Sequence, residues 1–117
     1  MIVTNQPIDT AVYAALKVTT GAEFVVELVN TFLEEAPGML AELRKGRADG
    51  DVERFRRAAH SIKSNANTFG AVGLAAQARA LELAGFDANT AHDEAAITAL
   101  DEEHARAAEA LKVLCNG

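Results

Sequence analysis

The stretch DVERFRRAAHSIKSNANTFGA, residues 51–71, contains six apolar residues at helical spacing. Each lies three or four positions from the next: Val52, Phe55, Ala59, Ile62, Ala66 and Phe69. At the angular step of an α-helix they fall within one arc of roughly 100°, the width of a core-facing stripe. We therefore predict an amphipathic helix that is capped by Asp51 and ends near Thr68, before Gly70.

His60 lies on the opposite side of this predicted helix, roughly 135° from the centre of the apolar arc. The polar and charged residues on the same side are Glu53, Arg56, Arg57, Lys63, Ser64 and Asn67. We therefore expect the imidazole of His60 to be exposed, beside cations and small polar side chains.

Further helices are predicted on both sides of this stretch. The apolar spacing and turn signals place them at Asp9 to Val18, residues 22–48, residues 71–84 and Thr90 to Leu114. Pro37 should kink or divide the second of the five helices. The alanine-rich fourth helix should allow close approach of its neighbours.

No sustained period-two alternation typical of strands is present. Four substantial amphipathic helices with short connections predict an all-α fold, an antiparallel up-and-down four-helix bundle with an additional short N-terminal helix packed across it. The 117 residues are enough for a single domain, 1–117, and half of them are hydrophobic.

The charge and the cysteine content limit which partners and which cellular locations are expected. The formal net charge of −6 argues against a nucleic-acid partner. A lone cysteine fits a reducing compartment, and charges interrupt every apolar run, so we expect a cytoplasmic protein without a membrane partner. Seven of the 11 Lys and Arg residues nevertheless lie in one basic segment that contains His60: Arg44, Lys45, Arg47, Arg54, Arg56, Arg57 and Lys63. By charge alone, this segment could also be an ordinary solvated helix face.

Two further histidines have different expected positions. His104 falls in line with the apolar stripe of the last helix and should be buried or half-buried, with a hydrogen-bond partner on a ring nitrogen. His92 should lie on the surface. No two histidines have metal-ligand spacing, and the chain has neither a Gly-x-Ser-x-Gly turn nor a phosphate-cradling glycine loop. These patterns argue against a metal site, a serine hydrolase and ATP binding.

The stretch AAHSIKSNANTFGA, residues 58–71, resembles the signature of histidine-containing phosphotransfer (HPt) domains, roughly His-x-Leu-Lys-Gly-Ser-Ser followed by Gly-Ala. The preceding segment FVVELVNTFLEEAPGMLAELRKGRADGDVERFRRAAH, residues 24–60, is also similar, including its mid-helix proline. The resemblance covers about residues 22–85. It implies a helical phosphorelay protein whose docking surface lies on the second and third helices.

The resemblance implies roles for single residues. His60 would accept the phosphoryl group, and Lys63 would stabilise it. Ser64 stands where the family most often has glycine, which leaves room for an incoming receiver domain. Arg56, one turn before His60, would supply a second positive charge, and Asn67 is a further neighbour on the same face. A neutral imidazole suits this chemistry, because the ordinary pKa of histidine is about 6.5.

The predicted function is a phosphorelay intermediate that takes a phosphoryl group from a receiver-domain aspartate and passes it to another receiver. It would need no cofactor or ATP-dependent kinase activity of its own, with Mg²⁺ only in the receiver. The partners would be response-regulator receiver domains, with a hybrid histidine kinase as a further candidate, and the protein a monomer. Two alternatives remain open: a non-transferring helical adaptor that binds receivers, and a dimeric histidine-kinase-type phosphotransfer domain.

Overall fold

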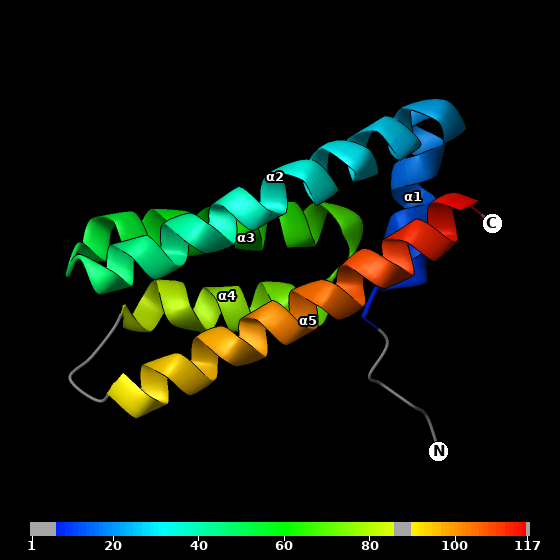
Figure 1. The fold of residues 1–117 in the computed structure, drawn as a ribbon. Coiled ribbons are helices and arrows are strands. Elements are labelled where there is room, and N and C mark those ends of the chain that lie inside the picture. Colours follow the sequence, from blue (N-terminus) through cyan, green and yellow to red (C-terminus); the bar gives the residue numbers. More distant parts are fainter. Residues whose placement is uncertain (1–6, 86–89, 117) are drawn as a thin grey trace, which may run out of the picture.

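The computed structural model describes residues 7–85 and 90–116, and this part of the chain contains helices and no strands. The five helices are α1 (Thr10–Thr20), α2 (Ala22–Ala48), α3 (Val52–Phe69), α4 (Val72–Ala84) and α5 (Thr90–Asn116) (Figure 1). The predicted all-α class is confirmed, and every predicted helix is present. Most of the predicted loop between α4 and α5, residues 86–89, lies outside the described residues.

Residues at the helix ends fix where the chain turns. The Asp9 carboxylate accepts a hydrogen bond from the Ala11 amide at 3.0 Å, and the Asp51 carboxylate accepts one from the Arg54 amide at 3.1 Å. Gly70 ends α3 with a φ of +78°, a conformation that favours glycine. The Asp9 amide donates to the Gly70 carbonyl at 2.7 Å, so the start of α1 is attached to the end of α3.

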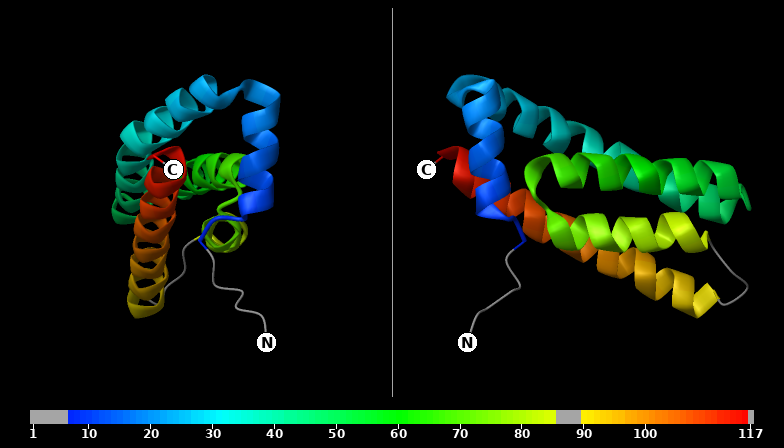
Figure 2. Two further views of the ribbon diagram at one scale, coloured as in Figure 1. Left: turned by 90° about the vertical axis from the view of Figure 1, so that its right-hand side faces the viewer. Right: turned by 180° about the vertical axis from the view of Figure 1, so that it is seen from behind.

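The core lies between α2, α3, α4 and α5. α3 packs against α2 and α4, and α5 packs against the same two helices (Figure 2). Five of the six predicted apolar-arc residues of α3 are buried, and Val52 is half-buried. The Phe32 ring of α2 lies 5.3 Å from the Phe69 ring, centroid to centroid. α1 contacts α2 and α3, and it crosses the end of the other helices as predicted (Figure 1).

Pro37 does not divide α2, which is continuous from Ala22 to Ala48. A proline removes the hydrogen bond to the carbonyl four residues earlier, here that of Leu33. Pro37 is exposed, so water is available to the freed carbonyl. The buried Ala36 beside it keeps the helix packed on the core.

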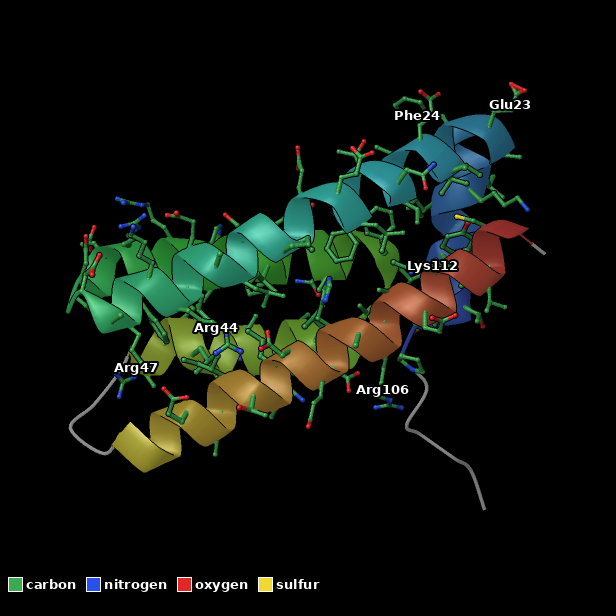
Figure 3. The ribbon with its side chains drawn as sticks, viewed as in Figure 1. Glu23, Phe24, Arg44, Arg47, Arg106 and Lys112 are labelled. Atoms are coloured by element: carbon green, nitrogen blue, oxygen red, sulfur yellow. The ribbon has the colours of Figure 1, made fainter. Side chains whose placement is uncertain are left out.

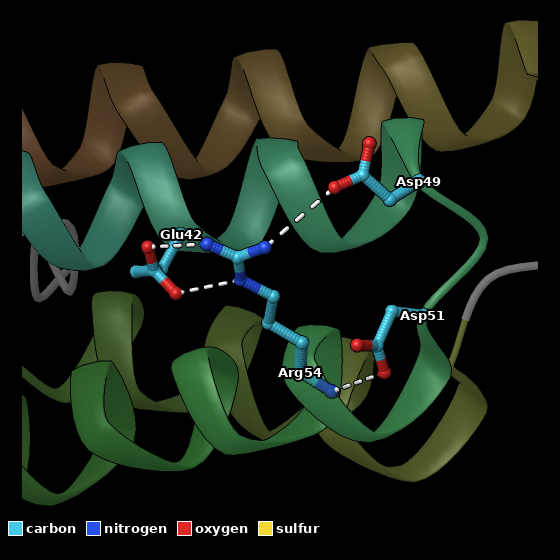
Figure 4. A network of polar contacts seen from close by, with 4 residues as sticks. All are labelled: Glu42, Asp49, Asp51 and Arg54. Carbon is cyan, nitrogen blue, oxygen red and sulfur yellow. Dashed lines mark hydrogen bonds and ion pairs between the residues drawn. The ribbon is translucent and has the colours of Figure 1, made fainter.

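Arg54 joins the adjoining ends of α2 and α3 (Figure 4). Its Nε and Nη2 donate to the two Glu42 carboxylate oxygens at 2.8 and 2.9 Å, and Nη1 lies 3.6 Å from Asp49 Oδ2. The hydrogen bond from Arg54 lowers the pKa of Glu42. The positive charge of Arg54 is therefore matched by carboxylates.

A second ion pair, between Arg44 and Asp101, connects α2 with α5. Among the described residues, no helix combines the length and the apolar character needed to cross a membrane.

Candidate functional site

His60 is exposed on α3, as its position on the helical wheel predicts. Its side chain is 58% exposed, whereas the neighbouring Ala59 and Ile62 are buried. The imidazole therefore stands outside the packed interior and is open to a reaction partner.

Glu82 of α4 holds His60 and Lys63 together. Nδ1 of His60 lies 2.8 Å from Glu82 Oε2, and the Lys63 ammonium nitrogen lies 2.8 Å from Glu82 Oε1. α3 and α4 pack against each other, and both carry small buried residues, Ala59 and Ala66 on α3 and Ala75 and Ala78 on α4, which allow helices to approach closely. The predicted close approach of the alanine-rich helix thus brings a carboxylate to the histidine.

The charge of Glu82 determines which ring nitrogen of His60 carries the proton. The hydrogen bond from Lys63 lowers the pKa of Glu82, and the one from His60 lowers it further, while burial opposes both. The carboxylate is therefore ionised at neutral pH and acts only as an acceptor. Nδ1 must then be the donor, so a neutral imidazole keeps its lone pair on Nε2. Nε2 is the nucleophilic atom of this arrangement.

Arg56 lies on the other side of His60. Both residues line one surface hollow, together with Arg57, Ser61, Glu53 and Glu82. The Arg56 guanidinium lies at the C-terminal end of α4: a Cβ added to Gly85 would be 3.2 Å from its Nη2. A cation at this helix end is favoured by the helix dipole.

The other predicted site residues lie farther along α3. Ser64 and Asn67 are exposed, one and two turns after His60. Asn67 lines a hollow with Lys63, on the side away from His60. The structure thus gathers His60, Lys63 and Arg56 around Glu82, while Ser64 and Asn67 border this group.

Glu82 and Arg79 were not predicted from the sequence. They are the two charged residues of the segment 71–84, three positions apart, and therefore share one face of α4. A charged pair on one face of an alanine-rich helix indicates that this face is exposed. The sequence alone did not show that this face adjoins His60, since that depends on how α3 and α4 are aligned.

His104 belongs to the core side of α5. It is half-buried, as predicted, and its ring centroid lies 5.8 Å from that of Phe32. Nε2 is buried without a hydrogen-bond partner among the described residues, so the predicted partner of a ring nitrogen is not at this atom. The surroundings are largely apolar, and burial lowers the pKa of His104. The predicted surface position of His92 lies outside the described side chains.

Comparison with known proteins gives one match, to a protein family. A family model described as "Hpt domain" matches residues 27–110, more than two thirds of the chain. The matched segment contains His60, Lys63 and Glu82. No curated protein and no solved structure gives a significant match.

Proposed function

Because this chain belongs to the Hpt domain family, which acts with receiver domains in the histidine phosphotransfer of two-component signalling, we propose that His60 is its phosphoryl acceptor. One observation carries this proposal: an exposed histidine whose Nδ1 donates to an ionised carboxylate at 2.8 Å, which leaves Nε2 free to react.

The proposed reaction forms one bond and breaks one. The Nε2 lone pair of His60 attacks the phosphorus of an aspartyl phosphate on a receiver domain. The bond between phosphorus and the aspartate oxygen breaks, and the aspartate leaves as a carboxylate. The imidazole ring gains positive charge while Nδ1 keeps its proton, and the Glu82 carboxylate stabilises that charge. The reverse reaction, with the aspartate of a second receiver, completes the relay.

Lys63 and Arg56 supply positive charge to the transferred group. Phosphoryl transfer passes through a transition state with charge spread over the phosphoryl oxygens, so positioned cations stabilise it. Lys63 is paired with Glu82 in the resting protein, one turn from His60, and its flexible side chain reaches either group. Ser64 and Asn67 complete the face that the receiver meets, and the small Ser64 leaves space for it.

Replacing Lys63 with Ala is expected to slow transfer from a phosphorylated receiver by about tenfold without abolishing it. The variant loses one cation near the phosphoryl group, worth about 1–2 kcal/mol at a partly exposed site. Rapid-quench measurement of radiolabel transfer tests this. Lys112→Ala is the matched control, because Lys112 is an exposed lysine on α5 (Figure 3). Equal slowing in both variants would refute a specific role for Lys63.

Glu82 is proposed as a positioning residue. Glu82→Ala should slow labelling of His60 severalfold, because Nδ1 loses the acceptor that fixes its proton. Glu82→Gln should restore only part of the rate, since the amide oxygen still accepts a hydrogen bond from Nδ1 but carries no negative charge to stabilise the imidazolium. Nitrogen-15 chemical shifts of the imidazole report the tautomer directly: a single Nδ1–H form in the wild type and a mixture in Glu82→Ala. A wild-type Nε2–H form would contradict this role.

The contacts of α2, α3, α4 and α5 support an antiparallel up-and-down bundle within one chain, and hence a monomer. A dimeric kinase-type domain builds its bundle from two chains, so sedimentation equilibrium distinguishes the two.

Labelling by a phosphorylated receiver is the direct test of function. The product should be acid-labile and base-stable, as expected for phosphohistidine. A chain that binds receivers without becoming labelled would be the adaptor instead.

A further inference from the structure

Two large apolar side chains on α4 are exposed, and one of them, Leu83, directly follows Glu82 of the His60 site. Leu83 is 66% exposed and Val72 is 51% exposed. They are eleven residues apart, which places them on one face of the helix about 16 Å apart along its axis. This face points away from the buried side of α4, which carries Leu74, Ala78 and Leu81.

These two side chains border adjoining hollows between α3 and α4. Leu83 lines one with Arg56, Lys63, Arg79 and Glu82. Val72 lines the next, which shares Lys63 and Arg79 with the first. We call the residues of both hollows the α3–α4 strip: Arg56, Lys63, Asn67, Val72, Ala75, Ala76, Arg79, Glu82 and Leu83. The strip lies on the face where α3 and α4 run side by side (Figure 2, right).

The strip combines exposed apolar side chains with more positive than negative charges. Three cations, Arg56, Lys63 and Arg79, line it together with one carboxylate, that of Glu82. In a chain with a net charge of −6, this local excess of positive charge favours an acidic partner surface.

The other side of His60, toward α2, offers less. The hollow there is lined by one large apolar side chain, that of Met39, which is half-buried. Its two cations are Arg54, whose charge is matched by Glu42 and Asp49, and the exposed Arg57, against three cations in the strip. Phe24 is exposed, but it lies in the first turn of α2 (Figure 3), whereas the end of α2 packs beside the first half of α3.

We propose that the receiver domain docks on the α3–α4 strip, rather than on the second and third helices as the family resemblance implies. The occupant would present an apolar patch flanked by carboxylates, next to its phosphorylated aspartate. This inference rests on the proposed function, because transfer requires the aspartate to reach Nε2 of His60. Leu83 would lie beside that contact, next to Glu82, whereas Val72 would contact the receiver about three turns away along α4, and Arg79 would guide the approach.

The double variant L83S/V72S is expected to bind the receiver at least about tenfold more weakly and to accept label correspondingly slowly. Both positions are exposed, so folding should be preserved. Val113→Ser is the matched control, since Val113 is 63% exposed on α5, and it should bind like the wild type. Arg79→Gln should reduce the association rate severalfold and weaken its salt dependence. Isothermal calorimetry and stopped-flow fluorescence measure these effects.

Phosphoramidate, a small phosphoryl donor that needs no docking surface, separates docking from chemistry. It should label L83S/V72S and wild type to the same extent. Wild-type affinity and transfer in L83S/V72S, or an equal loss in Phe24→Ser, would overturn the docking inference alone. If phosphoramidate labels His60 but no phosphorylated receiver does, the proposed function fails, and the docking inference fails with it.

Discussion

A His60→Gln variant is expected to accept no phosphoryl group from a phosphorylated receiver domain, while its far-UV circular dichroism spectrum stays native. Glutamine has no nucleophilic nitrogen, because its amide lone pair is delocalised, so the acceptor atom is lost. The side chain is exposed, and Glu82 keeps its ion pair with Lys63. The free energy of unfolding should therefore change by no more than about 0.5 kcal/mol.

His104→Gln is the matched control for this experiment. His104 is half-buried against Phe32, and we propose no part for it in phosphoryl transfer. Its variant should become labelled to the same extent per folded molecule. Label remaining on the His60 variant, or label lost from the His104 variant instead, would show that the acceptor has been misidentified.

The helices and the orientation of His60 were predictable because both depend on local sequence. Apolar spacing decides which side of a helix faces the core, and capping residues such as Asp51 and Gly70 mark its ends. The exposed position of His60 follows from the same geometry. Residues 51–71 alone were sufficient for that prediction.

Glu82 was not predictable, because its role depends on the alignment of two helices. Its contact with His60 joins residues 22 positions apart, and a shift of α4 by one turn would replace it with another side chain. The buried alanines of both helices are compatible with more than one alignment, so they give no sequence signal of the pairing itself. The continuity of α2 through Pro37 also depends on tertiary structure. Packing of α2 on the core outweighs the tendency of proline to break a helix.

The packing that holds α3 in place predicts a second large effect, at Gly46. Gly46→Ala is expected to destabilise the protein by about 2–3 kcal/mol, although alanine is the better helix former. A Cβ at this position would lie 2.7 Å from the Phe55 amide nitrogen and 3.0 Å from its Cα. These are backbone atoms of α3, which no side-chain rotation can move. α2 and α3 must therefore separate, which loosens the packing of the buried Leu43 and Phe55.

Gly38→Ala in the same helix is the matched control. A Cβ there meets nothing within 4 Å, so only the higher helix propensity of alanine acts. The free energy of unfolding of this variant should rise by about 0.5–1 kcal/mol. Urea unfolding followed by circular dichroism measures both variants, with equal slopes expected if only stability changes. The changes in the free energy of unfolding should have opposite signs in the two variants. The substitution and the helix are the same, so the difference would report the distance of each glycine from α3. If Gly46→Ala were as stable as Gly38→Ala, the close contact between α2 and α3 that positions His60 would be refuted.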